Sequence, residues 1–583
     1  MSKASPKPAL TVGIVGHRSN RLPAETRVKV EQCLISMLKT LKAAFEASWR
    51  RYADTFEIRE GALTLVSALA EGADTMTARA ALTEGYLLDA ILPFPCDQYE
   101  KDFKGAELPE FRELLSRARS VLELMGTRAN EGKSYEAAGI AILDYSDLLI
   151  AVWDGGPSTG RGGTLELISE AGRRGLPIIL IDANARTPTI IRWHGLLSGR
   201  RIFTHIDDHP ASLFEGSIDH VVEALIRPPA NADECLGLKR FLSDRPASCI
   251  GHQGFPWLMA MFFVRWPRWS DWRPAQSGGS AGPTGLDAGR HEDLLVSAYE
   301  RADAVSVYFS QMFRSAFVEN FLFSAFAVVA AAVSLVLKPQ WPFALLELLL
   351  IAWVLHSTGT GLKRHWQQRW IQPREVAERL RVAVPMAILG TRPLGPYGEA
   401  STWTSWYTRA LLRQACITPG CVDNERLRQV RSGLVSLLKE QSAYQELTAW
   451  RFSALSRRMQ LAGKLLLSAT ILAVLAHLVA EFRLLPWISD QPLLRDQLIM
   501  LATALPAVGA ALFGIRTIGD FDSAAKRAQR MREELEDLFR ILAKLPDEFH
   551  ALRAFCHVVE DVLLGDVASW RLSAESRGLS VPG

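Results

Sequence analysis

The sequence predicts an α/β domain with a Rossmann-like parallel sheet at the N-terminus, followed by an all-α membrane region with four transmembrane helices in two hairpins. Short apolar runs alternate with helical patterns up to residue 226, and four long apolar segments follow beyond residue 310. The mean hydropathy of +0.07 is high for a soluble protein. It is the value expected when a soluble part and a membrane part of one chain are averaged. A chain of 583 residues is also too long for one hydrophobic core.

Composition narrows the classes of function. The net charge of +3, with 22% charged residues, gives no general basic surface, so no nucleic-acid partner is expected. The first ten residues, MSKASPKPAL, lack the apolar core of a signal peptide, which predicts a cytoplasmic N-terminal domain. We find no zincin, kinase, P-loop or catalytic-triad pattern, and therefore predict no metal site and no cofactor.

Five apolar runs define the predicted sheet, and helical patterns separate them. The runs are 10–15, 63–69, 87–94, 147–153 and 177–182. Continuous apolar strands between helices are typical of a parallel sheet covered on both faces. Ligands bind such sheets beyond the carboxyl ends of the strands, often at a helix N-terminus.

Glycines and polar residues gather at these strand ends. The candidate ligand-binding residues are Gly16, His17, Arg18, Gly72, Asp74, Pro93, Asp154, Gly155, Gly162, Gly163, Thr164 and Glu166. Glycine lets backbone N–H groups approach a phosphate, and arginine pairs with phosphate bidentately. The carboxylates accept hydrogen bonds from ribose or base. The alternatives are structural: tight turns for the glycines, an N-cap for Asp74, a dipole partner for Glu166 and simple packing for His17.

As an ordered set, these motifs resemble the SLOG superfamily over residues 8–225. The matching stretches are VGIVGHR, SALAEGADTMTARAA, LPFP, SDLLIAVWDG and GRGGTLELISEA. That superfamily includes the lonely-guy phosphoribohydrolases and nucleotide-sensing domains of bacterial defence systems. The hydrolase motif PGGxGTxxE is matched by Gly162, Gly163, Thr164 and Glu166, but the proline is missing and Glu166 stands two residues after Thr164 instead of three. The resemblance implies a nucleotide-derived ligand.

Residues 227–290 form a Trp-rich segment and a linker. The stretch 256–274 combines an apolar run with arginines and with Trp257, Trp266, Trp269 and Trp272. It lies either at a membrane interface, which favours Trp and Arg, or against the sheet or the later domain. The Gly- and Ser-rich stretch 275–290 predicts a flexible linker.

Four apolar segments, 316–337, 341–362, 464–482 and 497–515, approach the length needed to span a bilayer. They form two hairpins, and basic residues such as Lys363, Arg364, Arg457 and Arg458 flank their open sides. The positive-inside rule then predicts a multi-pass protein of the inner (cytoplasmic) membrane with both termini in the cytoplasm. The alternative is a soluble helical bundle.

The two hairpins belong to an internal repeat. AYERADA and AYQELTA precede them, and AERLR and AQRMR follow them. The units cover 291–400 and 436–550, with a helical connector at 401–435 and a tail at 551–583. This layout resembles the two-span SLATT module of bacterial conflict systems, which implies a membrane-perturbing or pore-forming effector. Glu347 and His477 lie in the spans and are candidate pore residues.

The predicted function is a sensor of a nucleotide-derived second messenger, coupled to a membrane-disrupting effector in antiphage defence. The lipid bilayer and further copies of the chain are its expected partners. The alternative is a membrane-tethered N-glycosidase acting on nucleotides or NAD, in which Glu166 stabilises an oxocarbenium-like ribose and Arg18 holds phosphate. A third hypothesis, a constitutive transporter or scaffold, requires no nucleotide binding.

Overall fold

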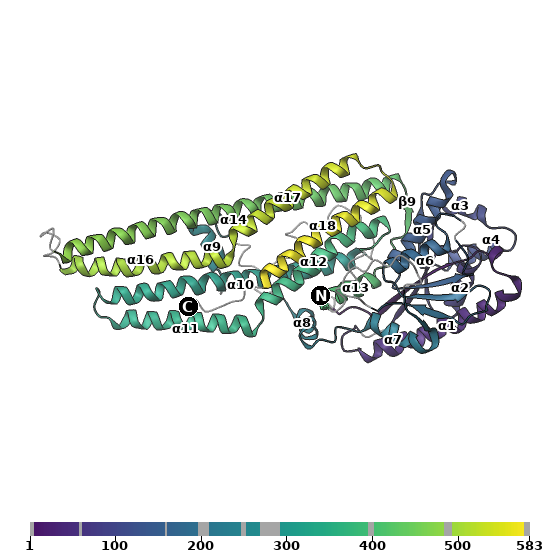
Figure 1. The fold of residues 1–583 in the computed structure, drawn as a ribbon, viewed down its shortest axis with the longest axis horizontal. Helices are drawn as coiled ribbons and strands as arrows, with labels where there is room; N and C mark the ends of the chain where they lie inside the picture. Colours follow the sequence, from purple (N-terminus) through teal and green to yellow (C-terminus); the bar gives the residue numbers. More distant parts are fainter. Residues whose placement is uncertain are drawn as a thin grey trace.

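The computed structural model describes residues 5–57, 61–157, 160–195, 209–245, 252–268, 292–393, 402–482 and 492–575. The molecule is elongated, with a sheet domain at one end and a stack of long helices extending from it (Figure 1). The predicted fold class, an α/β domain followed by helices in two apolar hairpins, is confirmed. The predicted linker 275–290, together with Trp269 and Trp272, lies outside the described residues.

One nine-stranded sheet forms the centre of the α/β domain. In chain order its strands are β1 (Ala9–Gly16), β2 (Ala62–Ser67), β3 (Leu87–Leu92), β4 (Ser120–Leu124), β5 (Leu148–Trp153), β6 (Ile178–Asp182), β7 (Ile190–Arg192), β8 (Ala211–Leu213) and β9 (Gly420–Val422). The spatial order is β8-β7-β6-β5-β1-β2-β3-β4-β9. All neighbours are parallel except β6–β7 and β7–β8. The sheet is therefore mixed at one edge, where the sequence predicted only parallel strands.

Helices cover both faces of the sheet. α1 (Ala24–Arg51) packs against α2 (Ala73–Thr83) and α7 (Phe214–Ile226) on one face, while α5 (Glu131–Tyr145) packs against α6 (Thr164–Arg173) on the other (Figure 1). The short α3 (Cys96–Tyr99) and α4 (Glu107–Ser116) connect β3 to β4. Strands β2 to β4 lie on one side of β1, whereas β5 and β6 lie on the other side. Right-handed crossovers therefore put the two groups of helices on opposite faces of the sheet.

The connector predicted at 401–435 contributes to this domain. Its helix α13 (Trp403–Gln414) packs near β1, and β9 adds an edge strand beside β4, with Leu122 opposite Gly420 and Leu124 opposite Val422. Three residues are too few to show the alternating pattern of a strand in the sequence. β9 is therefore identified only by its pairing with the free edge of β4. The predicted connector is thus part strand as well as helix.

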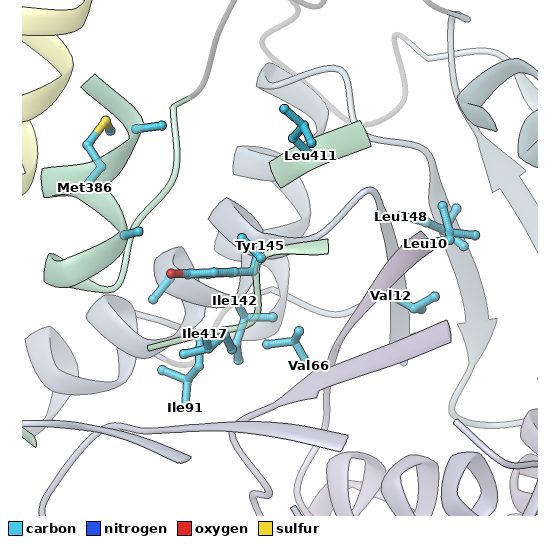
Figure 2. Packing of buried hydrophobic residues seen from close by; sticks show 14 of the residues in the cluster. Leu10, Val12, Val66, Ile91, Ile142, Tyr145, Leu148, Met386, Leu411 and Ile417 are labelled. Atoms are coloured by element: carbon cyan, nitrogen blue, oxygen red, sulfur yellow. The ribbon is translucent and has the colours of Figure 1, made fainter. Parts of the chain in front are cut away.

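The hydrophobic core continues from the sheet into the later helices. In Figure 2, Met386, Leu411 and Ile417 lie around Tyr145 and Ile142 of α5. They share one buried cluster with the strand residues Leu10, Val12 and Val66. Burial of apolar surface is the main stabilising contribution to folding, so the α/β domain and the helices next to it are stabilised together.

The helical region consists of two units with the same order of elements. The first is α10 (Glu292–Ser334), α11 (Trp341–Lys363) and α12 (Trp366–Leu389), and the second is α14 (Asn424–Glu481), α16 (Pro492–Gly519) and α17 (Phe521–Lys544). A left-handed residue breaks the chain at the matching point of each unit, His365 (φ 52°) before α12 and Asp520 (φ 45°) before α17. The repeat noticed in the sequence therefore has a matching backbone geometry.

Within the described residues, four helices are long and apolar enough to cross a membrane: α10, α11, α14 and α16. The four predicted segments lie in them, apart from residues 335–337 and 482. α10 packs against α11 and α16, and α16 packs against α14, so the four form a row with α11 and α14 at its outer sides (Figure 1). At the other end of the region, α18 (Phe549–Glu575) packs against α12. Two shorter helices, α8 (Ala232–Ser243) and α9 (Gly254–Met261), precede the first unit.

Candidate functional site

The candidate site lies at the topological switch point of the sheet. β1 and β5 are neighbours, but the chain leaves them toward opposite edges. The loops that follow their carboxyl ends therefore separate, and ligands of other doubly wound sheets bind at this point. Gly16, His17 and Arg18 follow β1, Asp154 and Gly155 follow β5, and Thr164 begins α6. The structure brings these predicted residues together.

His17 and Asp154 form the centre of the site. His17 is buried, and its Nε2 lies 2.9 Å from Asp154 Oδ1. Arg21 donates to Asp154 Oδ2 from Nη2 (2.6 Å) and Nε (3.1 Å), and Gly156 N–H donates to Oδ1 (2.9 Å). Burial raises the pKa of Asp154, but the hydrogen bonds from Gly156, His17 and Arg21 outweigh it and lower the pKa to about 2. The carboxylate is thus ionised and faces a histidine and an arginine.

The N-terminus of α6 adjoins this centre through Thr164. Its hydroxyl lies 3.5 Å from His17 Nδ1. Gly163 is the N-cap residue of α6, and Glu166 Oε2 accepts a hydrogen bond from Gly162 N–H (2.7 Å). The carboxylate of Glu166 thus fixes the loop that leads into its own helix. Unsatisfied N–H groups and the helix dipole at such a terminus favour an anion.

A second cluster surrounds Asp102, at the carboxyl side of β3 and β4. Arg18 Nη2 (3.2 Å) and Arg128 Nη1 (2.6 Å) donate to its carboxylate, and so does the Tyr135 hydroxyl. The Arg18 guanidinium also lies 5.1 Å from the centre of the Tyr135 ring. The sequence pattern singled out Arg18 alone. Arg21, Asp102, Arg128 and Tyr135 carry no motif, and only the position of Arg21 three residues after Arg18 hinted at a role.

At two of the predicted glycines, neighbouring backbone atoms come so close that a side chain would not fit. Gly72 has φ 103°, and a Cβ there would lie 2.7 Å from both His17 O and Ser19 N. Gly162 has φ 78°, and its Cβ would lie 2.5 Å from Glu136 N. These positions favour glycine on steric grounds, so they hold the loops of the site in place. The structural alternative considered for the glycines thus accounts for both.

Asp74 and Pro93 are part of the scaffold beneath the site. Asp74 is the second residue of α2, is buried, and lies 3.5 Å from the Ser67 hydroxyl. Burial raises the pKa of Asp74 to about 7, against the opposing hydrogen bonds from the backbone of Ala70 and from Ser67. Pro93 is buried directly after β3. Asp74 therefore holds the loop between β2 and α2, where the buried Leu69 has a left-handed φ of 53°.

The opposite, amino edge of the sheet holds a buried polar joint to the helical region. Asp144 of α5 is fully buried and accepts hydrogen bonds from Arg174, at the C-cap of α6 (2.6 Å), and from Arg553 of α18 (2.6 and 2.8 Å). Thr391, two residues after the end of α12, donates its hydroxyl to the same carboxylate. Burial raises the pKa of Asp144, but Arg174 and Arg553 lower it below its usual value. α6 thus extends from Thr164 at the candidate site to this joint, over about 15 Å at 1.5 Å per residue.

The two candidate pore residues do not meet within one chain. Glu347 lies on α11 and His477 on α14, the helices at the two outer sides of the row. His477 Nδ1 is buried and has no hydrogen-bond partner in the part of the chain that the structure describes. Glu319, also near a span, accepts a hydrogen bond from Gly254 N–H of α9 (2.9 Å) and so has a structural role.

Comparisons with protein-family models, with curated proteins and with solved structures found no match for this chain. Within the described ranges, no group of three or more His, Cys, Asp or Glu side chains is arranged to hold a metal ion.

Proposed function

We propose that this chain is a cytoplasmic sensor of a nucleotide-derived signal that controls a pore-forming or membrane-disrupting effector in antiphage defence. The observation that carries the proposal is α6. Its N-terminus belongs to the switch-point cluster of His17, Asp154 and Thr164, and its C-terminus contacts the buried Asp144 joint. A ligand that changes the position of one end of a short rigid helix changes the contacts at the other end.

The charges at the site favour an anionic ligand with a sugar. Arg18, Arg21 and Arg128 converge on the carboxyl edge, next to the N-terminus of α6. Each is now paired with Asp102 or Asp154, so a phosphate would replace a carboxylate as its partner. The released carboxylates are then free to accept hydrogen bonds from ribose hydroxyls or a base. In this exchange the arginines keep an anionic partner, and the carboxylates keep hydrogen-bond donors.

Coupling to the membrane follows from the Asp144 joint. α18 and Thr391, two residues after α12, both contact Asp144. α12 packs along α10, which continues into the first candidate span. A ligand shifts such an equilibrium only if it binds one state better than the other. We propose that the ligand favours the arrangement in which the spans open.

The effector is proposed to be a homo-oligomer in the inner membrane. The four apolar helices of one chain lie in a row, and a row encloses no passage (Figure 1). If several copies of the chain lie side by side, α11 of one copy meets α14 of the next copy. Glu347 and His477 then become partners of each other across this contact. By the positive-inside rule, the basic residues that flank the hairpins support a cytoplasmic location for both termini.

The test is a thermal-shift screen of the purified protein with nucleoside monophosphates, cyclic nucleotides, NAD and ADP-ribose, followed by leakage assays in dye-loaded vesicles. Specific binding raises Tm. The double variant Arg18→Ala/Arg128→Ala should lose that shift, and Arg112→Ala, at an exposed Glu100 pair of the same domain, should keep it. A ligand that binds without ever changing leakage contradicts the effector role.

The N-glycosidase alternative is examined in the same samples. Release of free base, lost in Glu166→Gln, supports the hydrolase. The carboxylate of Glu166 accepts a hydrogen bond from Gly162 N–H and so has a structural role. For this reason the sensor remains the first hypothesis.

A further inference from the structure

α9 lies against the helical stack at the level where three candidate spans become apolar. Leu258 and Met259 of α9, with Phe262 and Val264 of the turn after it, face the stack. They form a buried cluster with Val318 of α10, Leu455 and Met459 of α14, and Leu512 and Ile515 of α16. Glu319 of α10 fixes the start of α9 through Gly254 N–H, and Arg458 of α14 fixes its end by donating to Phe262 O (2.6 Å). The segment is therefore held firmly on the stack.

The outer side of the same segment is apolar and exposed. The exposed fractions are 55% for Trp257, 51% for Met261, 75% for Phe263 and 66% for Trp266. Two tryptophans, a phenylalanine and a methionine thus face outward within ten residues. Scattered exposed apolar side chains are common, but a contiguous group of large ones marks an interaction surface.

Phe263 stands in a conformation that favours glycine. Its φ is 54°, and the turn is closed by bonds from Phe263 N to Ala260 O and from Val264 N to Met259 O, both 2.8 Å. Glycine is the usual residue at this point after a helix, because a Cβ strains the left-handed backbone. Since Phe263 is largely exposed, packing against the described residues does not compensate for that strain. This points to a contact outside the chain.

The exposed surface is continuous with the apolar surface of the spans. Leu461 and Leu465 of α14 and Phe513 of α16 are exposed just beyond the cluster that holds α9. Arg458 and Arg516 lie at the level of that cluster, next to its members Met459 and Ile515, where the charged part of the helices begins. A Trp-rich, apolar surface between a lipid-facing belt and a basic region fits the boundary between headgroups and acyl chains.

We infer that α9 and the turn after it form an interfacial anchor, with Trp257, Met261, Phe263 and Trp266 inserted at the surface of a phospholipid bilayer. This inference rests on the membrane placement in the proposed function. The anchor fixes how deep the stack sits. It also ties the chain just before the first unit to the membrane surface.

The test uses the full chain in vesicles of phosphatidylethanolamine and phosphatidylglycerol, with the photoreactive residue p-benzoylphenylalanine at single positions. Lipid adducts are expected at 263 and 266, and also at the exposed span residue Leu348, but not at the exposed Val28 on α1. Adducts at 348 but none at 263 or 266, or adducts there to protein only, would overturn the anchor. No adduct at 348 would instead remove the membrane placement itself, and the anchor with it.

A second variant separates anchoring from folding. Phe263→Gly relieves the left-handed strain, so it should raise Tm in detergent while lowering the yield of lipid adduct at position 266 several-fold. Phe263→Leu keeps an apolar side chain and should retain most of the adduct. A lower Tm for Phe263→Gly would mean that Phe263 stabilises the fold, and would contradict the anchor.

Discussion

Arg553 of α18 donates two hydrogen bonds to the fully buried carboxylate of Asp144 on α5. The two residues are 409 positions apart in the chain. The same carboxylate is held by Arg174 at the end of α6. One side chain therefore joins the helix that begins at the candidate site to the helices that continue toward the spans.

Arg553→Met should destabilise the protein by about 3 kcal/mol, because it removes a partner from a buried charge. The measurement is Tm of the detergent-solubilised chain. Arg540→Ala, in an exposed pair with Asp537, should change stability by less than about 1 kcal/mol. If Arg553→Met unfolds at the same Tm as the wild type, as the control should, Asp144 does not join the α/β domain to α18.

Asp154→Asn should lower stability at neutral pH, and the deficit should shrink as the pH falls. The folded pKa of Asp154 is about 2, below that of the unfolded chain, so its contribution is present above about pH 4 and is lost as pH falls toward 2. Thermal unfolding of both proteins between about pH 7 and pH 3 checks this. Asp54→Asn, at a highly exposed carboxylate, should match the wild type throughout. A constant deficit for Asp154→Asn would mean that ionisation is not the cause.

Asp74→Asn should have the opposite pH dependence. Burial raises the folded pKa of Asp74 to about 7, so the folded state keeps a proton that the unfolded chain releases from about pH 4 upward. Asp74 thus costs stability increasingly between about pH 4 and pH 7. The neutral amide should raise Tm at pH 8, and this gain should vanish near pH 4. A variant less stable than the wild type at pH 8 would refute the assignment.

Gly72→Ala should destabilise the α/β domain by more than about 1 kcal/mol, since its Cβ would meet the backbone of His17 and Ser19 at positive φ. Gly216→Ala in α7 is the matched control. No atom lies within 4 Å of its added Cβ, and alanine favours a helix by up to about 1 kcal/mol. Tm should fall for the first variant and rise or stay unchanged for the second.

The sequence predicted the elements whose signal is local. Apolar runs marked β1, β2, β3, β5 and β6, and the four apolar segments lie in α10, α11, α14 and α16. β4 was missed because Ser120 and Glu123 interrupt the apolar run in SVLEL, and β7 and β8 were missed because three residues show no period. For the candidate site, the strand-end positions of His17, Arg18, Asp154 and Thr164 were predictable, since carboxyl ends of parallel strands share one edge.

The sequence by itself determined the two structural classes, the internal repeat and the strand ends that face the candidate site, because periodicity and hydropathy are properties of neighbouring residues. Only the tertiary structure decided that Asp102 and Asp154 hold the arginines, that β9 completes the sheet, and that Asp144 joins α6 to α18. Those contacts link residues tens to hundreds of positions apart. Their partners are chosen by packing and by the cost of leaving a buried charge unpaired, and neither leaves a local pattern in the chain.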